Sequence, residues 1–362
     1  MSIRRLQNQS AKSAITRRSL LARAGSAALG AGIAGTFVLT AGKAKAADHI
    51  VLISWGGNYR EAVENTLCKP FTKETGIDVT VADTPDLAKV KVQVTTGRVE
   101  WDVFDGPGAM IMSGSRAGFW EPLNRSIVDT TDIPVGANSD NVAFYLAAGG
   151  IGFDPKRTPA GKHPEDFAQF WDVTAFPGRR GLRTRISEML EMALIADGVA
   201  PKQLYPLDVE RGFKSLGKIK PNITKWIDES PQALTLVQTN EIDFSYVYSG
   251  RVKNAQAQGA SIDYSFKQSI NIPEYLAVLK DAPHKEAAMK FVAFALRPDR
   301  NAAFAEALSY IPANSKSAAL MSEASRKWLP DVASPNNVTM DDAWWADKFD
   351  DLQKRFKEWL IT

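Results

Sequence analysis

Apolar residues along the chain fall into two kinds of run, one short and continuous and the other spaced as on a helix. Residues 49–54 (HIVLIS) form a mostly apolar run of strand length. Residues 59–76 (YREAVENTLCKPFTKETG) then repeat apolar positions every three or four residues up to a glycine. The run IDVTV at 77–81 returns to strand character. This order predicts a βαβ unit, and the same alternation further along predicts an α/β fold with mostly parallel sheets.

Two further apolar runs predict strands that cross between separate parts of the molecule. One is NVAFYLAAGGIGFD at 141–154, which Gly149 and Gly150 interrupt, and the other is EYLAVLK at 274–280. Small residues in the middle of a long strand suit a crossing point between two lobes. A simple β-bulge is the alternative explanation of the two glycines.

The length of the chain after residue 46 exceeds what a single hydrophobic core usually organises, so two lobes are expected. The crossing strands then set the boundaries. We predict a first lobe from residues 47–148 plus 275–362 and a second lobe from residues 149–274.

The last twenty residues before the carboxyl terminus predict an amphipathic helix, DDAWWADKFDDLQKRFKEWL. A stripe on one face favours packing against the body of the protein over binding to a partner. The stripe consists of Trp345, Phe349, Leu352, Phe356 and Trp359.

The amino-terminal stretch has the features of an export signal. Arg17 and Arg18 precede Ser-Leu-Leu and a glycine-rich, weakly apolar segment, which ends in AKA at Ala46. We expect residues 1–46 to be a twin-arginine signal peptide that is cleaved after Ala46. An uncleaved tether is the alternative. The protein is therefore expected to be exported to the periplasm.

Removal of this signal would change the sign of the net charge of the protein. The chain has 44 Lys and Arg residues and 41 Asp and Glu residues, but eight of the basic residues and none of the acidic ones lie in residues 1–46. Residues 47–362 therefore carry a formal net charge of −5, and no basic stripe indicates a nucleic-acid partner.

Cys68 is the single cysteine, which rules out an internal disulfide and a thiolate cluster. The three histidines lie far apart without the spacing of metal ligands, so we expect no metal and no cofactor. Nor does the chain contain a G-x-S-x-G motif or a histidine close to a candidate nucleophile, and we expect no catalytic residue.

The stretch SWGGNY at 54–59 places Trp55 at the end of the first predicted strand, followed by two glycines and Tyr59. A turn between core aromatic residues is one interpretation. A ligand site is the other, because glycines let the backbone approach a ligand closely.

Three further stretches, FTKETGIDV, WDVFDGPGAMIMSGSRAGFWEPL and EAAMKFVAFALRPDRNAAFAEALSYIPAN, resemble the periplasmic substrate-binding proteins of ABC importers, specifically the spermidine/putrescine-binding group. The resemblance implies a two-lobed α/β fold of type II, in which a ligand cleft lies between lobes joined by two crossing strands. It also implies delivery of the ligand to an ABC permease at the inner membrane. We expect the protein to be a monomer.

In the polyamine-binding relatives, a tryptophan stacks on the ligand, aromatic residues enclose its methylenes and carboxylates bind its amines. Carried over by position, the resemblance gives a set of ligand-binding residues: Trp55, Tyr59, Glu188, Tyr248, Glu274, Tyr310 and Trp344 or its neighbour Trp345. Ile272 stands where the relatives have a tryptophan, and Arg185 stands where they have an aspartate.

Arg185 changes the expected ligand, because a guanidinium in a partly dehydrated cleft repels a second ammonium group. One interpretation pairs Arg185 with Glu188 and keeps a polyamine as ligand. The other is a zwitterion, such as an ω-amino acid or an aminophosphonate, with its amine on Glu274 or Glu188 and its anion on Arg185.

Further residues are candidate ligand contacts. Two arginines, Arg183 and Arg251, are candidate anion donors. The helix start at Ser230 is another, with Ser230 as the expected N-cap and Pro231 as the first helical residue. Asp105 is either an amine contact or a cap of the next helix.

The expected function is capture of a small solute that carries an amine, either a polyamine or a zwitterion, and its delivery to the permease. An exported enzyme on the same fold and a sensor that serves a membrane receptor are the alternatives.

Overall fold

The computed structural model describes residues 49–362, which form one compact unit. The predicted signal peptide at 1–46 lies outside the described residues. No helix within the described range combines the length and the apolar character that a bilayer-spanning helix needs.

The strands of residues 49–362 form one 11-stranded sheet, whose main path runs β2-β1-β3-β9-β4-β7-β5-β6. The short strands β8, β10 and β11 pair with β4, β4 and β9. The bounds are β1 His49–Ser54, β2 Asp78–Asp83, β3 Val103–Pro107, β4 Asn141–Phe153, β5 Arg180–Arg183, β6 Ile223–Ile227, β7 Phe244–Tyr248, β8 Asp263–Tyr264, β9 Ile270–Val278, β10 Ile311–Pro312 and β11 Val338–Thr339.

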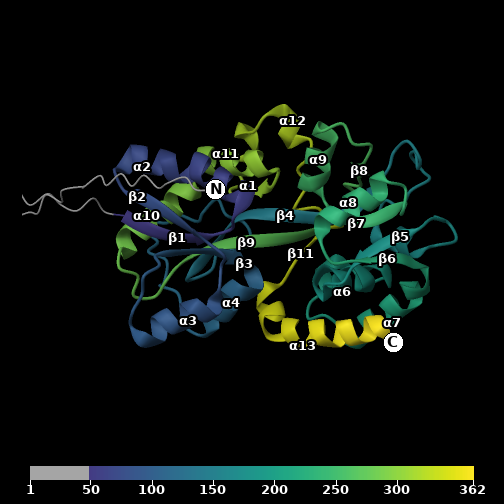
Figure 1. Ribbon diagram of the computed structural model, residues 1–362, viewed down its shortest axis with the longest axis horizontal. Coiled ribbons are helices and arrows are strands. Elements are labelled where there is room, and N and C mark those ends of the chain that lie inside the picture. The colour runs from purple at the N-terminus through teal and green to yellow at the C-terminus, as the bar shows by residue number, and fades with distance from the viewer. Residues whose placement is uncertain (1–48) are drawn as a thin grey trace, which may run out of the picture. The chain divides into compact units, whose positions relative to one another are not determined.

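Helices pack on this sheet along the whole described chain (Figure 1). The α-helices are α1 Gly57–Val63, α2 Lys69–Thr75, α3 Leu87–Thr96, α4 Gly108–Arg116, α5 Phe167–Trp171, α6 Ile186–Ala196, α7 Val209–Ile219, α8 Ser230–Gln238, α9 Ser249–Ala257, α10 Lys285–Ala295, α11 Pro298–Leu308, α12 Glu323–Arg326 and α13 Asp342–Ile361. A π-helical turn at Glu64–Cys68 joins α1 to α2, and 3₁₀ turns occupy Pro201–Gln203, Lys220–Asn222 and Ala318–Leu320.

The two predicted crossing strands, β4 and β9, are the long central strands of the sheet (Figure 1). They pair antiparallel with each other, β3 pairs antiparallel with β9, and β7 pairs antiparallel with β4. The expectation of mostly parallel pairing is therefore wrong at the centre of the sheet. Strands that leave a lobe and return to it run in opposite directions, so their pairing is antiparallel.

Gly149 and Gly150 lie in a regular part of β4, so the bulge interpretation is wrong; the register of β4 shifts earlier, between Ala143 and Tyr145. A Cβ atom on Gly149 would lie 1.7 Å from the hydroxyl of Tyr246, and one on Gly150 would lie 2.5 Å from that of Tyr264. The glycines therefore make room for two tyrosine rings against the strand.

Two large hydrophobic cores lie at either end of β4 and β9. The first is built from residues 50–148 and 275–313, and the second from residues 151–270 together with residues 338–356. Helix α13 packs on the body as its stripe predicted, because Trp345, Leu352 and Phe356 are buried in the second core.

Helix α13 also contacts the helix that follows β3. Arg116 of α4 donates to Asp347 and to the carbonyl of Ala343, while further along the amide of Gln353 donates to the carbonyl of Thr184. The helix therefore contacts elements that belong to both predicted lobes.

One predicted helix start differs in detail. Helix α8 has Glu229 as its N-cap, without a side-chain hydrogen bond, and Ser230 is already its first residue. Ser230 therefore does not cap the helix as predicted.

Candidate functional site

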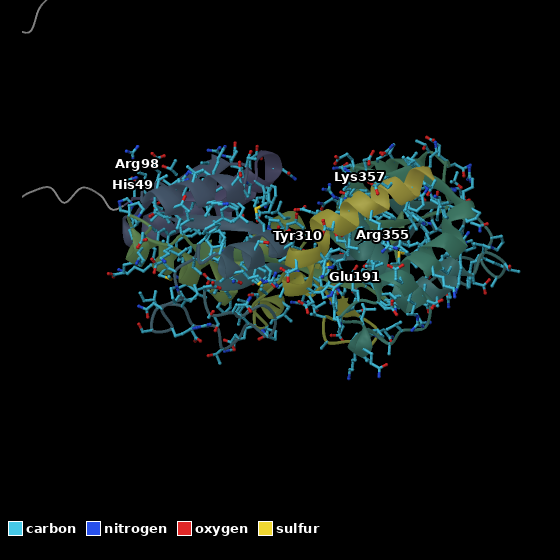
Figure 2. The ribbon with its side chains drawn as sticks, turned by 90° about the horizontal axis from the view of Figure 1, so that it is seen from below. His49, Arg98, Glu191, Tyr310, Arg355 and Lys357 are labelled. Carbon is cyan, nitrogen blue, oxygen red and sulfur yellow. The ribbon has the colours of Figure 1, made fainter. Side chains whose placement is uncertain are left out.

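A cavity of about 640 Å³ is lined by residues of both large cores. Tyr310, one of its lining residues, lies near the middle of the molecule beside the start of α13 (Figure 2). The cavity lining includes polar, charged and aromatic side chains: Tyr59, Tyr145, Arg185, Glu188, Tyr248, Arg251, Glu274, Tyr310, Asp342, Trp345 and Phe349.

Glu274 lines the cavity and has free hydrogen-bonding capacity, and a second such carboxyl group, Asp105, lies outside the lining. Glu274 of β9 lies opposite Pro107 of β3 and Tyr145 of β4, and its Oε2 is buried without a hydrogen-bond partner among the described residues. Burial, together with the charges of Asp105 and Asp342, raises the pKa of Glu274 well above its usual range. An incoming ammonium group would supply the missing partner.

Asp105 of β3 lies behind this carboxylate and is buried. Its Oδ2 accepts hydrogen bonds from Ser54 Oγ at 2.6 Å and from the hydroxyl of Tyr59 at 2.9 Å, and its Oδ1 has no partner within residues 49–362. Burial raises the pKa of Asp105 to about 7, although the two hydrogen bonds lower it. Helix α4 begins after Pro107 without a side-chain cap, so the capping role considered for Asp105 is wrong.

Three tyrosines form an aromatic wall next to these carboxylates. The rings of Tyr145 and Tyr310 stack with centroids 4.3 Å apart at 14°, and Tyr59 lies 6.1 Å from Tyr145. Burial raises the pKa of Tyr310 to about 12, so its phenol stays neutral near pH 7. Neutral aromatic faces beside carboxylates are a favourable environment for an alkylammonium group.

The cavity lining also contains a cation, Arg185, whose charge lowers the pKa of Glu274 and of Asp342 against the stronger effect of burial. Arg185 is the exposed N-cap residue of α6; its Nε donates to Ser187 Oγ at 2.6 Å, and its guanidinium carbon lies 5.1 Å from the ring centroid of Phe349. Among residues 49–362 it forms no ion pair within 4 Å. Arg251, exposed in the first turn of α9, also lines the cavity.

Glu188 is paired, but with a different arginine from the one considered. Its Oε1 lies 3.7 Å from Nη1 of Arg183, and its Oε2 accepts a hydrogen bond from the hydroxyl of Tyr248 at 2.8 Å. The pairing of Arg185 with Glu188 is therefore wrong. The reason is local backbone geometry: Glu188 has φ +75°, and this turn directs its carboxylate to the end of β5 and away from Arg185.

A second buried carboxylate of α6 supports this turn. Glu191 accepts hydrogen bonds from the backbone N–H of Glu188 at 2.8 Å, from the indole of Trp345 at 2.6 Å and from the hydroxyl of Tyr205 at 2.5 Å. Burial raises the pKa of Glu191 to about 7. Glu191 thus ties the cavity-lining turn of α6 to α13 (Figure 2).

Six of the predicted site residues line this cavity: Tyr59, Arg185, Glu188, Tyr248, Glu274 and Tyr310. The other three do not. Trp55 is half-buried against the first core, Asp105 lies behind Tyr59, and Trp344 packs edge to face with Tyr205 while Trp345 lines the cavity. Direct ligand contact by any of the nine remains a prediction.

Sequence reasoning missed Tyr145, Glu191 and Asp342. Tyr145 lies inside an apolar strand and resembles a core residue, and Glu191 lies on a helix whose other residues are mostly apolar. Asp342 is the first residue of α13 and accepts a hydrogen bond from the hydroxyl of Tyr275 at 3.1 Å. A Cβ on Gly108 would lie 1.9 Å from Cγ of Asp342, so the start of α4 needs a glycine there.

Comparison with known proteins agrees with this architecture. Residues 66–335 match the family model of the bacterial extracellular solute-binding proteins. A gamma-aminobutyric acid-binding protein of Pseudomonas aeruginosa PAO1 is 33% identical over 322 residues, which cover 86% of this chain and 90% of the relative. The putrescine-binding periplasmic protein SpuD of Pseudomonas aeruginosa UCBPP-PA14 is 24% identical over 335 residues, which cover 85% and 89%.

The solved structure of the Atu4243-GABA receptor superposes with a TM-score of 0.79 at 33% identity and covers 86% of this chain and 98% of that one. The chain therefore belongs to the bacterial extracellular solute-binding proteins and has their two-lobed α/β fold. Within that family it is a substrate-binding component of ABC importers, related to proteins that bind 4-aminobutyrate and polyamines.

Proposed function

We propose that this protein captures a zwitterionic ω-amino acid of the 4-aminobutyrate type and delivers it to an ABC permease. The supporting observation is that one cavity presents both signs of charge: among residues 49–362, Glu274 has a buried oxygen without a hydrogen-bond partner, and Arg185 forms no ion pair within 4 Å. The ammonium group would lie on Glu274, with Asp105 behind it. The carboxylate would lie on Arg185, with Arg251 as a second donor.

Two relatives support this choice of ligand. The gamma-aminobutyric acid-binding protein and the GABA receptor are each 33% identical to this chain, against 24% for the putrescine-binding protein. The cavity is larger than 4-aminobutyrate, which agrees with lobes that close on the ligand. A diamine of the same length would bring its second ammonium group close to Arg185, at an electrostatic cost.

The proposal also covers the two lobes, the hinge between them and the export of the protein. The lobes are residues 47–148 plus 275–362 and residues 149–274, with β4 and β9 as the hinge. Helix α13 belongs to the first lobe by its place in the chain but packs its apolar stripe on the second core. The protein acts as a periplasmic monomer without catalytic activity, cofactor or nucleic-acid partner. Residues 1–46, outside the described part of the chain, direct its export by the twin-arginine route.

The test of the ligand class is isothermal titration calorimetry with 4-aminobutyrate and putrescine, which contain the same number of carbon atoms. Wild type is expected to prefer 4-aminobutyrate, and Arg185→Asp to prefer putrescine, because the substitution exchanges a cation for an anion at one end of the cavity. Arg98→Asp makes the same charge change at an exposed residue outside the cavity lining and is expected to leave the preference unchanged (Figure 2).

Tight binding of putrescine and no binding of zwitterions by wild type would refute the proposed ligand class. Intact 4-aminobutyrate recovered after the titration separates a binding protein from an enzyme. Loss of 4-aminobutyrate uptake on deletion of the cognate permease separates transport from sensing.

A further inference from the structure

The proposed binding of a zwitterion assigns no role to Glu188, although its carboxylate lines the cavity. Glu188 is 2% exposed and lies three residues after Arg185, in the non-helical turn at the start of α6. If its charge were free, the cavity would offer a carboxylate at each end. Such an arrangement suits a diamine better than a zwitterion.

Arg183 compensates this charge from outside the cavity lining. Its Nη1 donates to the hydroxyl of Tyr248 and lies 3.7 Å from Oε1 of Glu188, while the same hydroxyl donates to Oε2 of Glu188. The guanidinium carbon lies 5.6 Å from the ring centroid of Tyr248. Arg183, Tyr248 and Glu188 thus form a connected group in which the charges of Arg183 and Glu188 offset each other.

The position of Arg183 is fixed by the sheet rather than by a flexible loop. It is the last residue of β5 and pairs in register with Ile227 of β6. Its side chain is 12% exposed, and that of Glu188 is 3% exposed. Little water reaches the pair, so its electrostatic interaction is only weakly screened.

We infer that Arg183 is a specificity-determining residue, which neutralises Glu188 and thereby removes a second ammonium-binding site from the cavity. This inference rests on the proposed function, since it explains how one cavity selects a ligand with a single amine. Arg185 then remains as the unpaired charge at this end and selects an anionic group. Arg183 acts through Glu188 and does not contact the ligand.

The test is to remove the cation and leave the carboxylate. Arg183→Leu is expected to shift the ratio of the dissociation constants of 4-aminobutyrate and putrescine at least about tenfold towards putrescine, measured by isothermal titration calorimetry. Arg183→Lys, which retains the charge, is expected to keep the wild-type ratio within about threefold. Circular dichroism checks that each variant is folded.

Two further variants isolate the cause. Arg183→Leu combined with Glu188→Gln removes both charges and is expected to show no gain for putrescine. Arg179→Leu removes a cation that precedes the same strand and pairs with Asp243 outside the cavity lining, and is expected to leave the ratio unchanged. If Arg183→Leu does not fold, Arg183→Gln, which retains a donor for Tyr248, replaces it in both comparisons.

An unchanged ratio in a folded Arg183→Leu or Arg183→Gln variant overturns the inference. Equal weakening of both ligands overturns it as well, because Arg183 would then support the site without selecting between them. The proposed function fails separately, in wild type, if putrescine binds more tightly than 4-aminobutyrate there.

Discussion

At the scale of single residues, two carboxyl groups at the cavity are buried without an ion pair within 4 Å among residues 49–362. The Oε2 of Glu274 and the Oδ1 of Asp105 are both buried and unpartnered among the described residues. A buried carboxylate without a counter-charge destabilises the fold. That cost is understandable if a ligand supplies the missing cation.

Glu274→Gln is expected to weaken the binding of 4-aminobutyrate at least about tenfold, because a charge-assisted hydrogen bond contributes about 1.5–3 kcal/mol. The ligand-free variant is expected to melt at the same temperature as wild type or higher, because the substitution removes a poorly solvated carboxylate. Calorimetry and differential scanning fluorimetry provide the two measurements.

Glu121→Gln is the matched control for Glu274→Gln, since Glu121 pairs with Lys285 at 2.7 Å outside the cavity lining. It is expected to leave the affinity unchanged. A Glu274→Gln variant with wild-type affinity would show that the ammonium group lies elsewhere.

At the scale of elements, the start of α6 and the first turns of α13 depend on each other. Ser187 and Glu188 leave helical geometry inside α6, and Glu191 holds that turn through the backbone N–H of Glu188 while it accepts a hydrogen bond from Trp345. Docking of α13 therefore supports the turn that carries Glu188 and follows Arg185.

Glu191→Gln is expected to lower the free energy of unfolding by about 1–3 kcal/mol, because an amide has one acceptor atom for three donors and places its own N–H₂ group against them. The affinity for 4-aminobutyrate is expected to fall as well, because the turn that carries Arg185 is no longer fixed. Urea denaturation and calorimetry measure the two effects.

Glu210→Gln is the control, because Glu210 also joins α13 to the second core, through a surface ion pair with Arg355 (Figure 2). An exposed pair contributes about 0–1 kcal/mol. Equal losses of stability in the two variants would contradict a special role for Glu191.

At the scale of the whole molecule, three buried carboxyl groups make stability depend on pH. Burial raises the pKa values of Asp105, Glu191 and Asp342 to about 7, from ordinary values of 3.8, 4.5 and 3.8. Between these limits the folded protein binds more protons than the unfolded chain, so stability falls as pH rises. Carboxylates with a lowered pKa, such as Asp243, are already ionised above pH 5 and do not oppose this trend.

The melting temperature without ligand is therefore expected to fall between pH 5 and pH 8, measured by differential scanning fluorimetry. Saturating 4-aminobutyrate is expected to raise the melting temperature more at pH 8 than at pH 5.5, because its ammonium group favours ionised carboxylates. Asp105→Asn is expected to make the fall shallower. A melting temperature that rises steadily from pH 5 to pH 8 would contradict these assignments.

Local signals predicted most of the individual elements. Gly76 ends α2 with φ +74°, as its place after a helical run indicated, and the apolar stripe of α13 faces the second core. The antiparallel pairing of β4 with β9 was not predictable in this way, because an apolar run has the same composition in either direction.

By itself, the sequence determined the α/β class, the two crossing strands, the family and six of the residues that line the cavity. The class and the strands follow from periodicity along the chain, whereas the family and the six residues follow from the resemblance of sequence motifs to the polyamine-binding proteins. Only the tertiary structure decided which charges compensate one another. Arg183 and Arg185 are two residues apart, and both were candidate anion donors, but in the fold Arg183 lies 3.7 Å from Glu188 while Arg185 forms no ion pair within 4 Å among residues 49–362.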